Sequence, residues 1–354
     1  MRDLIVDAHL DLGWNALQWN RDLTQSVYTL RTHEAALPGR GQNTVALPEL
    51  RAGKIYLCVA TLMGRSTGTP SAHVDFHSAM QAHGISRGQL AYYRALEHHG
   101  YVTIITTLQA LDAHLQLIAE LPDDPKPAPI GFVISMESAD AILEPAEVGE
   151  WYALGVRAIG PAHYGMGRYA GGTGVEDGFT DIGFQLLDEM QQHNMILDLT
   201  HLTDVGFWQA LEKFDGTVIA SHNNCRALVP SQRQFSDEQI RAIAERGGVV
   251  GMAFDVWMMQ AGYIKGYTSN KDIPLSRIIE HIDHICQLTG NAQHVGIGSD
   301  LDGGYGREQS PHDLDTIADL QHLIPLLQQC GYAQADIDCI LHDNWIRILR
   351  TTWA

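Results

Sequence analysis

The sequence lacks the positive charge that binding to nucleic acids or anionic membranes requires. Its 354 residues contain 23 Lys and Arg against 42 Asp and Glu, which gives a formal net charge of −19. Phosphate recognition depends on clustered Lys and Arg, so this charge argues against a nucleic-acid partner and against docking on an anionic membrane surface. Hydrophobic residues make up 45% of the chain, so a globular protein is expected rather than a disordered one.

Cysteine is scarce, and long apolar runs are absent. The five cysteines are scattered, odd in number and without a CxxC pair, so we expect buried free thiols rather than a disulfide framework or a zinc ribbon. No window offers about 18 uninterrupted apolar residues, so no membrane-spanning helix is expected. The N-terminal segment has no signal-peptide core, so we expect a cytoplasmic protein in a reducing compartment.

What the sequence has is a repeated alternation of short apolar runs with amphipathic stretches. The apolar runs suit strands that are buried on both faces of a parallel sheet; they are Leu4–Val6, Ile55–Leu62, Val102–Ile105, Ile130–Ser135, Val156–Ile159, Met195–Leu199, Thr217–Ala220, Val249–Ala253 and Val295–Gly298. Helical patterns lie between them, at residues 73–99, 107–120, 181–194, 203–213, 237–246 and 274–289.

This alternation favours an α/β fold of the TIM type, a (β/α)8 barrel, over a doubly wound sheet. Residues 313–354 are expected to add two or three C-terminal helices. Because no linker, low-complexity segment or internal repeat interrupts the pattern, we expect residues 1–354 to form a single domain.

Polar residues that follow the apolar runs are the candidates for chemistry, because the active sites of barrels lie at the carboxyl ends of their strands. His9 and Asp11 follow the first run and point the same way in an extended segment, as suits a zinc site. Glu137 ends another run. His201 and His222 each follow a run, with one helix between them, and neutral imidazoles are common zinc ligands. Each residue alone also fits a structural role, as a cap, a core histidine or a salt-bridged carboxylate.

Asp300 follows the last run and can accept a proton from a metal-bound water or cap a helix. The whole set of strand-end residues indicates a metal site more specifically than any single residue does. An Asp, a Glu and three His, each directly after a buried strand, converge on one rim if the chain is a barrel, and the sequence therefore predicts a metal site there.

At these positions the sequence resembles the membrane (renal) dipeptidase family of the amidohydrolase superfamily. The resemblance runs from His9 to about Asp302, with order and spacing preserved. His9-Leu10-Asp11 matches the HxD of the family, and Glu137 matches its bridging Glu. The most specific match is HIDHI at residues 281–285 followed by HVGIGSDLDG at residues 294–303, which is similar to the family signature HIDHI…HVGIGSDFDG.

The resemblance implies a binuclear zinc centre in a (β/α)8 barrel. One zinc ion would be held by His9, Asp11 and Glu137. The second would be held by Glu137, His201 and His222, with Glu137 and a water or hydroxide bridging the two ions. Because no Lys stands at a strand end, the carbamylated lysine bridge used elsewhere in the superfamily is not expected.

The resemblance also implies roles in substrate binding. His163 would contact the substrate and steady the oxyanion, Arg233 would grip the terminal carboxylate, and Asp300 would shuttle a proton or bind the α-amino group. Residues 161–165 depart from the usual TLTH-x-x-x-N of the family, so His163 can also be an ordinary loop histidine, as Arg233 can be a solvated loop arginine. The loop Tyr164–Phe179 matches nothing familiar, and it leaves the identity of the dipeptide open.

Together these features predict a zinc-dependent dipeptidase that hydrolyses short peptides through the bridging hydroxide. The alternatives are another amidohydrolase reaction, on a lactone, an N-acyl amino acid or a β-lactam, and a barrel without catalytic activity. The expected partner is a small dipeptide, and the family suggests a homodimer. Since the secreted, lipid-anchored members carry a signal peptide and an anchor signal, this chain looks like a bacterial-type cytoplasmic relative.

Overall fold

The computed structural model describes residues 3–68, 74–121 and 128–354. Within these residues the strands are β1 (Val6–Leu10), β2 (Leu57–Met63), β3 (Val102–Ile104), β4 (Ile130–Glu137), β5 (Val156–Gly160), β6 (Ile196–Asp198), β7 (Val218–Ile219), β8 (Val250–Met252) and β9 (Val295–Ile297). Parallel pairing joins eight of them in the order β7-β6-β5-β4-β2-β1-β9-β8, and a parallel bridge between Ala220 and Val250 closes the ring. The predicted (β/α)8 barrel is confirmed.

The strand β3 lies off this ring and pairs with the first half of β4. Its residues are in register with Ile130–Phe132, while β5 pairs with β4 from Ile134 onward. The apolar run at residues 102–105 is therefore a strand, as predicted, but it adds to the barrel wall without becoming one of the eight strands in the ring.

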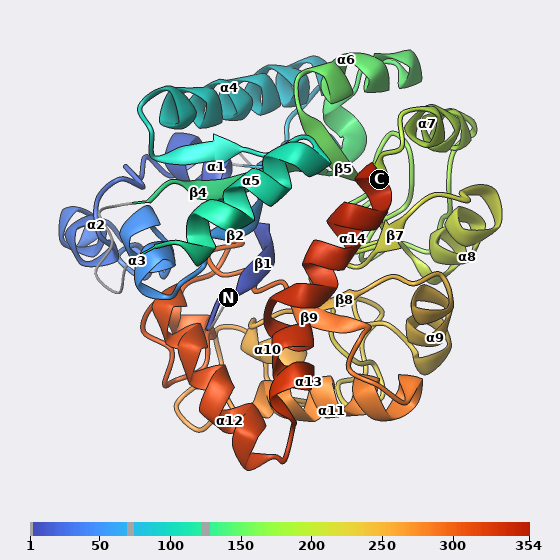
Figure 1. Cartoon of the computed structure of the whole chain (residues 1–354). Helices are drawn as coiled ribbons and strands as arrows, with labels where there is room; N and C mark the ends of the chain where they lie inside the picture. The colour runs from blue at the N-terminus through green and yellow to red at the C-terminus, as the bar shows by residue number, and fades with distance from the viewer. Residues whose placement is uncertain (1–2, 69–73, 122–127) are drawn as a thin grey trace.

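Helices surround the barrel in the described part of the chain (Figure 1). They are α1 (Leu12–Gln18), α2 (Val27–Glu34), α3 (Leu47–Ala52), α4 (Ala79–His98), α5 (Leu108–Ala119), α6 (Val148–Ala153), α7 (Asp181–Gln192), α8 (Asp204–Lys213), α9 (Asp237–Glu245), α10 (Val256–Met259), α11 (Arg277–Thr289), α12 (Leu323–Gln329), α13 (Gln334–Asp338) and α14 (Asn344–Trp353). The helix predicted at 73–99 begins at Ala79, because the Ser78 hydroxyl caps it by accepting from the Gln81 amide. Its expected start at residue 73 lies outside the described residues.

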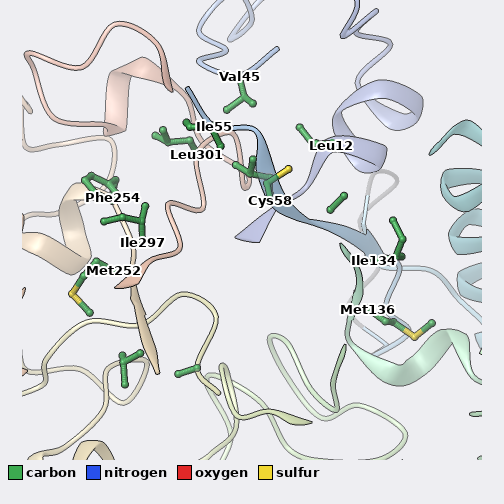
Figure 2. Close-up of a cluster of buried hydrophobic side chains, with 14 of the residues drawn as sticks. Leu12, Val45, Ile55, Cys58, Ile134, Met136, Met252, Phe254, Ile297 and Leu301 are labelled. Carbon is green, nitrogen blue, oxygen red and sulfur yellow. The ribbon is translucent and has the colours of Figure 1, made fainter. Parts of the chain in front are cut away.

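Alternation along each strand separates the side chains that face the helices from those that face the barrel interior. On β4, Ile134 and Met136 join the apolar layer between the strands and the helices, which Figure 2 shows. Val133 and Ser135 take the opposite side, and the Ser135 hydroxyl lies 3.0 Å from that of Thr61 on β2. Because Glu137 is two residues further along, it shares the interior side and lies at the carboxyl end of β4.

The C-terminal helix α14 packs against the starts of the barrel strands. Its Trp345 indole donates to the carbonyl of Ile297, and a Cβ atom at Gly296 would lie only 2.3 Å from that indole nitrogen. Trp345, Ile346 and other apolar residues of α14 form one cluster with residues near the strand starts. The helix therefore covers the amino end of the barrel, and the tail contributes the helices α12, α13 and α14, as predicted.

The cysteines are all free, as expected, but not all of them are buried. Cys58 and Cys225 lie in the core, Cys286 and Cys339 are half-buried, and Cys330 is exposed. The expectation of burial was wrong for Cys330, because it follows the last turn of α12, where the chain leaves the surface of the core. In the described part of the chain, each helix is too short or too polar to cross a membrane.

Candidate metal centre and substrate pocket

The carboxyl ends of the barrel strands bring the five predicted metal ligands together. His9 lies on β1, Asp11 follows it at the start of α1, and Glu137 ends β4. His201 and His222 follow β6 and β7. All five side chains are buried, with exposed fractions below 10%.

Glu137 lies between two groups of imidazoles. Its Oε1 atom is 3.2 Å from Nε2 of His201 and 3.3 Å from Nε2 of His222. Its Oε2 atom is 3.6 Å from Nε2 of His9, which in turn lies 3.8 Å from Oδ2 of Asp11. Oε1 is thus nearest to His201 and His222, and Oε2 is nearest to His9, while the ring centroids of His9 and His222 are only 3.8 Å apart.

The side chains of His163 and Asp300 lie at the edge of this cluster. Nε2 of His163 is 3.9 Å from Oε1 of Glu137, and Oδ1 of Asp300 is 3.8 Å from Nε2 of His9. By distance alone, the described residues offer three sets able to hold an ion: His9 with Glu137 and His222, His163 with Glu137 and His201, and Asp300 with His9 and Asp11.

Unpartnered polar atoms indicate that the cluster fits a metal ion. Nε2 of His9, Oδ1 of Asp11 and Oε1 of Glu137 are buried and have no hydrogen-bond partner among the described residues. A buried polar atom without a partner costs about 1–3 kcal/mol, so such atoms are rare in a well-packed interior. Imidazole nitrogens and carboxylate oxygens are the donors that zinc takes in proteins.

The ionisation of the cluster also favours a cation. Burial lowers the pKa of His201 and His222 well below the usual range, so both imidazoles are neutral, as metal ligands must be. Burial would lower the pKa of His9 too, but the adjacent carboxylates, Glu137 first among them, raise it to about 10. Burial raises the pKa of Asp300 to about 8, with a further contribution from Asp11. These buried carboxylates are short of positive charge, which a divalent cation supplies.

Neighbouring hydroxyl groups orient the imidazoles through their second nitrogen. The Nδ1 atoms of His9, His201 and His222 lie 3.4, 2.9 and 2.8 Å from the hydroxyls of Thr61, Thr173 and Ser221 respectively. A hydroxyl can accept from Nδ1–H, which leaves the Nε2 lone pair directed at the cluster. In that tautomer the three Nε2 atoms are available to bind an ion.

Thr173 lies in the loop Tyr164–Phe179, for which the sequence suggested no role. The loop folds back on itself through bridges between Tyr164 and Thr173 and between Ala170 and Phe179. The Thr173 amide donates to the carbonyl of His163, and its hydroxyl contacts His201. The loop therefore supports two candidate site residues.

Removal of the Thr173 hydroxyl is expected to weaken metal binding. Thr173→Val deprives Nδ1 of His201 of its partner, and loss of such an outer contact typically costs about 10- to 100-fold in metal affinity. Competition with a chromophoric chelator measures this affinity. Thr173→Ser keeps the hydroxyl and should bind metal as the unsubstituted protein does. Equal affinity in the valine and serine variants would show that this contact does not orient His201.

Around the site, four residues have positive φ angles, a backbone conformation that residues other than glycine rarely adopt. Ser138, His201, Asp300 and Asp302 have φ values of 67°, 69°, 55° and 63°. Each follows the end of a barrel strand. Such conformations cost of order 1–3 kcal/mol each and persist where the surrounding contacts enforce them, most often at functional sites. Here they turn the chain sharply as it leaves the barrel.

A cavity of about 620 Å³ lies over the cluster, a size typical of small-molecule sites. The predicted residues Asp11, Glu137, His163, His201, His222, Arg233 and Asp300 all line it. Aromatic side chains form much of the rest of the wall; they are Trp14, Tyr164, Trp257 and Tyr263. The cavity is large enough for a ligand of dipeptide size.

Arg233 is buried in the cavity wall rather than solvated. It donates to the Asn223 side chain and, at 3.0 Å, to the carbonyl of His222. These two bonds hold the guanidinium in a fixed position beside the cluster. They use two of its five N–H donors, so the other three are not needed for these two bonds.

Three charged residues of the cavity wall were missed from the sequence: Lys265, which follows α10, and the two strand-end residues Arg65 and Asp255. Arg65 follows β2 and contacts His163, and Asp255 follows β8 and accepts from Gln309 at 2.6 Å. Burial raises the pKa of Asp255 to about 7. Arg65 and Asp255 come just after an apolar run, so the rule that identified the other candidates would have identified them if it had been applied to every run.

The fold and the site together define a class of protein. A (β/α)8 barrel with clustered imidazoles and carboxylates at the carboxyl ends of its strands, under a cavity of small-molecule size, is the architecture of metal-dependent hydrolases.

The comparisons with known proteins identify the family. The family model for membrane dipeptidase (peptidase family M19) matches residues 2–353. This chain therefore belongs to the membrane dipeptidase family, and that membership makes it a hydrolase of the metallo-dipeptidase type.

Individual relatives agree with this family. An uncharacterized protein encoded in the pqqA 5′ region of Klebsiella pneumoniae is 33% identical over 218 residues, which are 59% of this chain and 77% of that protein. Dipeptidase tcpJ of Claviceps purpurea is 26% identical over 56% of this chain and 45% of its own length. A metallo peptidase from Rhodobacter sphaeroides, solved with a phosphinate mimic of the dipeptide L-Ala-D-Ala, shares the fold with a TM-score of 0.79. It is 24% identical over 99% of each chain.

Proposed function

We propose that this protein is a zinc-dependent dipeptidase with two metal ions bridged by Glu137. One ion would be held by His9, Asp11 and Glu137, and the other by Glu137, His201 and His222. The observation that carries the proposal is that one carboxylate contacts three imidazoles, with Oε1 of Glu137 nearest to His201 and His222 and Oε2 nearest to His9. Two divalent cations, when bound, lower the pKa of water toward neutrality and polarise the scissile carbonyl.

The remaining residues of the site would bind and orient the substrate. Nε2 of His163 lies 3.9 Å from Glu137, at the edge of the cluster where the substrate would react. From there it would donate a hydrogen bond to the oxygen of the scissile carbonyl as negative charge develops on that oxygen. Arg233, held by Asn223 and by the His222 carbonyl, would bind the terminal carboxylate through a planar guanidinium fork. Asp300 would receive a proton and pass it to the leaving amine.

The acidic part of the cavity wall supports a substrate with a free amino group. Asp255 and Asp300 both line the cavity, and neither belongs to the proposed ligand set. Arg65, Arg233 and Lys265 line the same cavity, so it offers carboxyl groups as partners for an ammonium group and positive charge for a carboxylate. A short peptide whose two termini are both free matches this arrangement, as the phosphinate dipeptide mimic in the Rhodobacter protein also suggests.

The proposal is tested with the zinc-loaded protein and a panel of dipeptides, their N-acetylated forms, a lactone and a β-lactam. Dipeptides with free termini should be hydrolysed. N-acetylation should lower kcat/KM by about 10- to 100-fold, because it removes a charge-assisted contact of roughly 1.5–3 kcal/mol. A metal-loaded protein that hydrolyses no dipeptide would contradict the proposal, and turnover confined to the lactone or the β-lactam would favour another amidohydrolase reaction.

A further inference from the structure

Arg65 links a fully buried carboxylate to the edge of the metal cluster. Its Nε donates to Oδ2 of Asp75 at 2.8 Å, and one terminal nitrogen donates to Nδ1 of His163 at 2.7 Å. The Arg65 side chain is 13% exposed and that of Asp75 is 0% exposed. Asp75 also accepts from the amide and the hydroxyl of Thr67, so the carboxylate that anchors Arg65 is itself held in place.

The direction of the bond between Arg65 and His163 follows from the chemistry of the guanidinium. A guanidinium has five N–H donors and no acceptor, and it stays protonated in proteins. Nδ1 of His163 must therefore accept, through its lone pair. Because the accepting Nδ1 carries no hydrogen, the ring cannot be a protonated imidazolium and is neutral. A neutral imidazole whose Nδ1 accepts carries its hydrogen on Nε2.

This arrangement is the reverse of that at His201 and His222. Their Nδ1 atoms face the hydroxyls of Thr173 and Ser221, which can accept a hydrogen and leave Nε2 bare for a metal. At His163 both ring nitrogens are engaged or protonated, so neither can bind an ion. Distance alone groups His163 with Glu137 and His201 as a possible ligand set, but the tautomer removes it from that set.

We propose that Arg65, anchored by Asp75, is a positioning residue that fixes His163 as an Nε2–H donor directed at the reacting carbonyl and keeps it from binding metal. The donor role of His163 in hydrolysis rests on the proposed function, whereas the tautomer does not. Arg65 acts through His163, and its own remaining donors are not needed for this role. In the sequence, this residue could have been noticed because Arg65 comes two residues after the end of β2.

The tautomer can be observed directly in the protein labelled with 15N-histidine, loaded with zinc or free of metal. The His163 signals are assigned by their loss in His163→Gln. We expect a protonated Nε2 and an unprotonated Nδ1 in both states, because the partner of Nδ1 is Arg65 and not an ion. A proton on Nδ1 would overturn the proposal, whether or not the protein hydrolyses dipeptides, so this readout separates it from the proposed function.

Kinetics of Arg65 variants test the consequence. Arg65→Met should lower kcat by about 10- to 100-fold and weaken a dipeptide phosphinate by a similar factor, while KM and the metal content stay near those of the unsubstituted protein. Because this variant leaves Asp75 buried and unpaired, the double variant Arg65→Met/Asp75→Asn removes both charges and should show the same kinetic loss in a more stable protein. Arg65→Lys should recover activity only in part, since one ammonium group cannot reproduce the fork.

A surface arginine gives the matched control. Arg94 on α4 pairs with Glu97 in solvent, and Arg94→Met should change neither kcat nor the His163 signals. If metal content fell in Arg65→Met and in His163→Gln together, His163 would be a ligand and the proposal would be wrong. If the double variant kept full kcat, Arg65 would be a structural residue only.

Discussion

Glu137→Gln is expected to lower kcat/KM for dipeptides by at least about 10³-fold and to reduce the bound metal below two ions per chain. The reason is geometric. Oε1 of Glu137 lies 3.2 and 3.3 Å from His201 and His222, and Oε2 lies 3.6 Å from His9, whereas an amide offers one oxygen and an NH₂ group that binds no cation. One side of the centre would therefore lose a ligand outright. Elemental analysis beside a dipeptide assay measures both effects in the same sample.

The variant should fold, because glutamine has the shape of glutamate and carries no charge. Burial raises the pKa of Glu137 well above its usual value, and His9 opposes this shift, so in the metal-free protein the replacement removes both a poorly solvated carboxylate and a charged partner of His9. Because these two effects oppose each other, the Tm of metal-free Glu137→Gln should stay close to that of the metal-free unsubstituted protein. The matched control is Glu150→Gln, at a side chain that is 55% exposed and pairs with Arg87 at the surface. Retention of two ions per chain in Glu137→Gln would contradict the bridging role.

Arg233→Met is expected to lower kcat/KM by about 10³-fold, chiefly through KM. Truncation of one partner of a buried charge pair costs about 3–5 kcal/mol, and the substrate carboxylate would lose its partner in the ground state and in the transition state alike. A dipeptide amide, which has no terminal carboxylate, provides the sharper readout. The original protein should prefer the dipeptide to its amide by a large factor, and this preference should nearly vanish in Arg233→Met.

The preference ratio separates binding from structure. Arg233 also donates to the His222 carbonyl, so its loss can disturb a proposed ligand. Such a disturbance would slow the dipeptide and its amide equally and leave their ratio unchanged. The control is Arg277→Met, at an exposed arginine that pairs with Glu280. An unchanged preference in Arg233→Met would show that another group binds the carboxylate.

The barrel could be predicted because its strands are continuous apolar runs, but the strand bounds could not be predicted as well. The run Leu4–Val6 predicts a strand that ends before the polar residues, whereas β1 extends from Val6 to Leu10 and contains Asp7 and His9. One oxygen of the Asp7 carboxylate, Oδ1, accepts from the amides of His9 and Ser299, whereas Oδ2 is buried without a hydrogen-bond partner among the described residues. His9 is two residues away in the sequence and Ser299 is 292 residues away. Hydrophobic periodicity carries no information about hydrogen bonds of either kind.

Short helices and loop contacts were the main omissions. The helices α1, α2, α3, α6 and α10 have four to eight residues, too few for a helical period to emerge in the sequence. Thr173 approaches His201 only because bridges fold the loop Tyr164–Phe179 back over the barrel. The strand-end candidates were easier to find, because the parallel barrel itself brings the ends of distant strands to one rim. The roles assigned to these residues stay predictions, as do the single domain, the cytoplasmic location and the homodimer.

The most direct test is a titration of the metal-free protein with zinc, followed by dipeptide hydrolysis and by metal analysis of the same samples. Activity should rise with added zinc and reach its maximum at two ions per chain, since both sides of Glu137 must be occupied. Full activity at one ion per chain, or in the metal-free protein, would contradict the binuclear account. A protein that binds two ions and hydrolyses no dipeptide would contradict the proposed reaction.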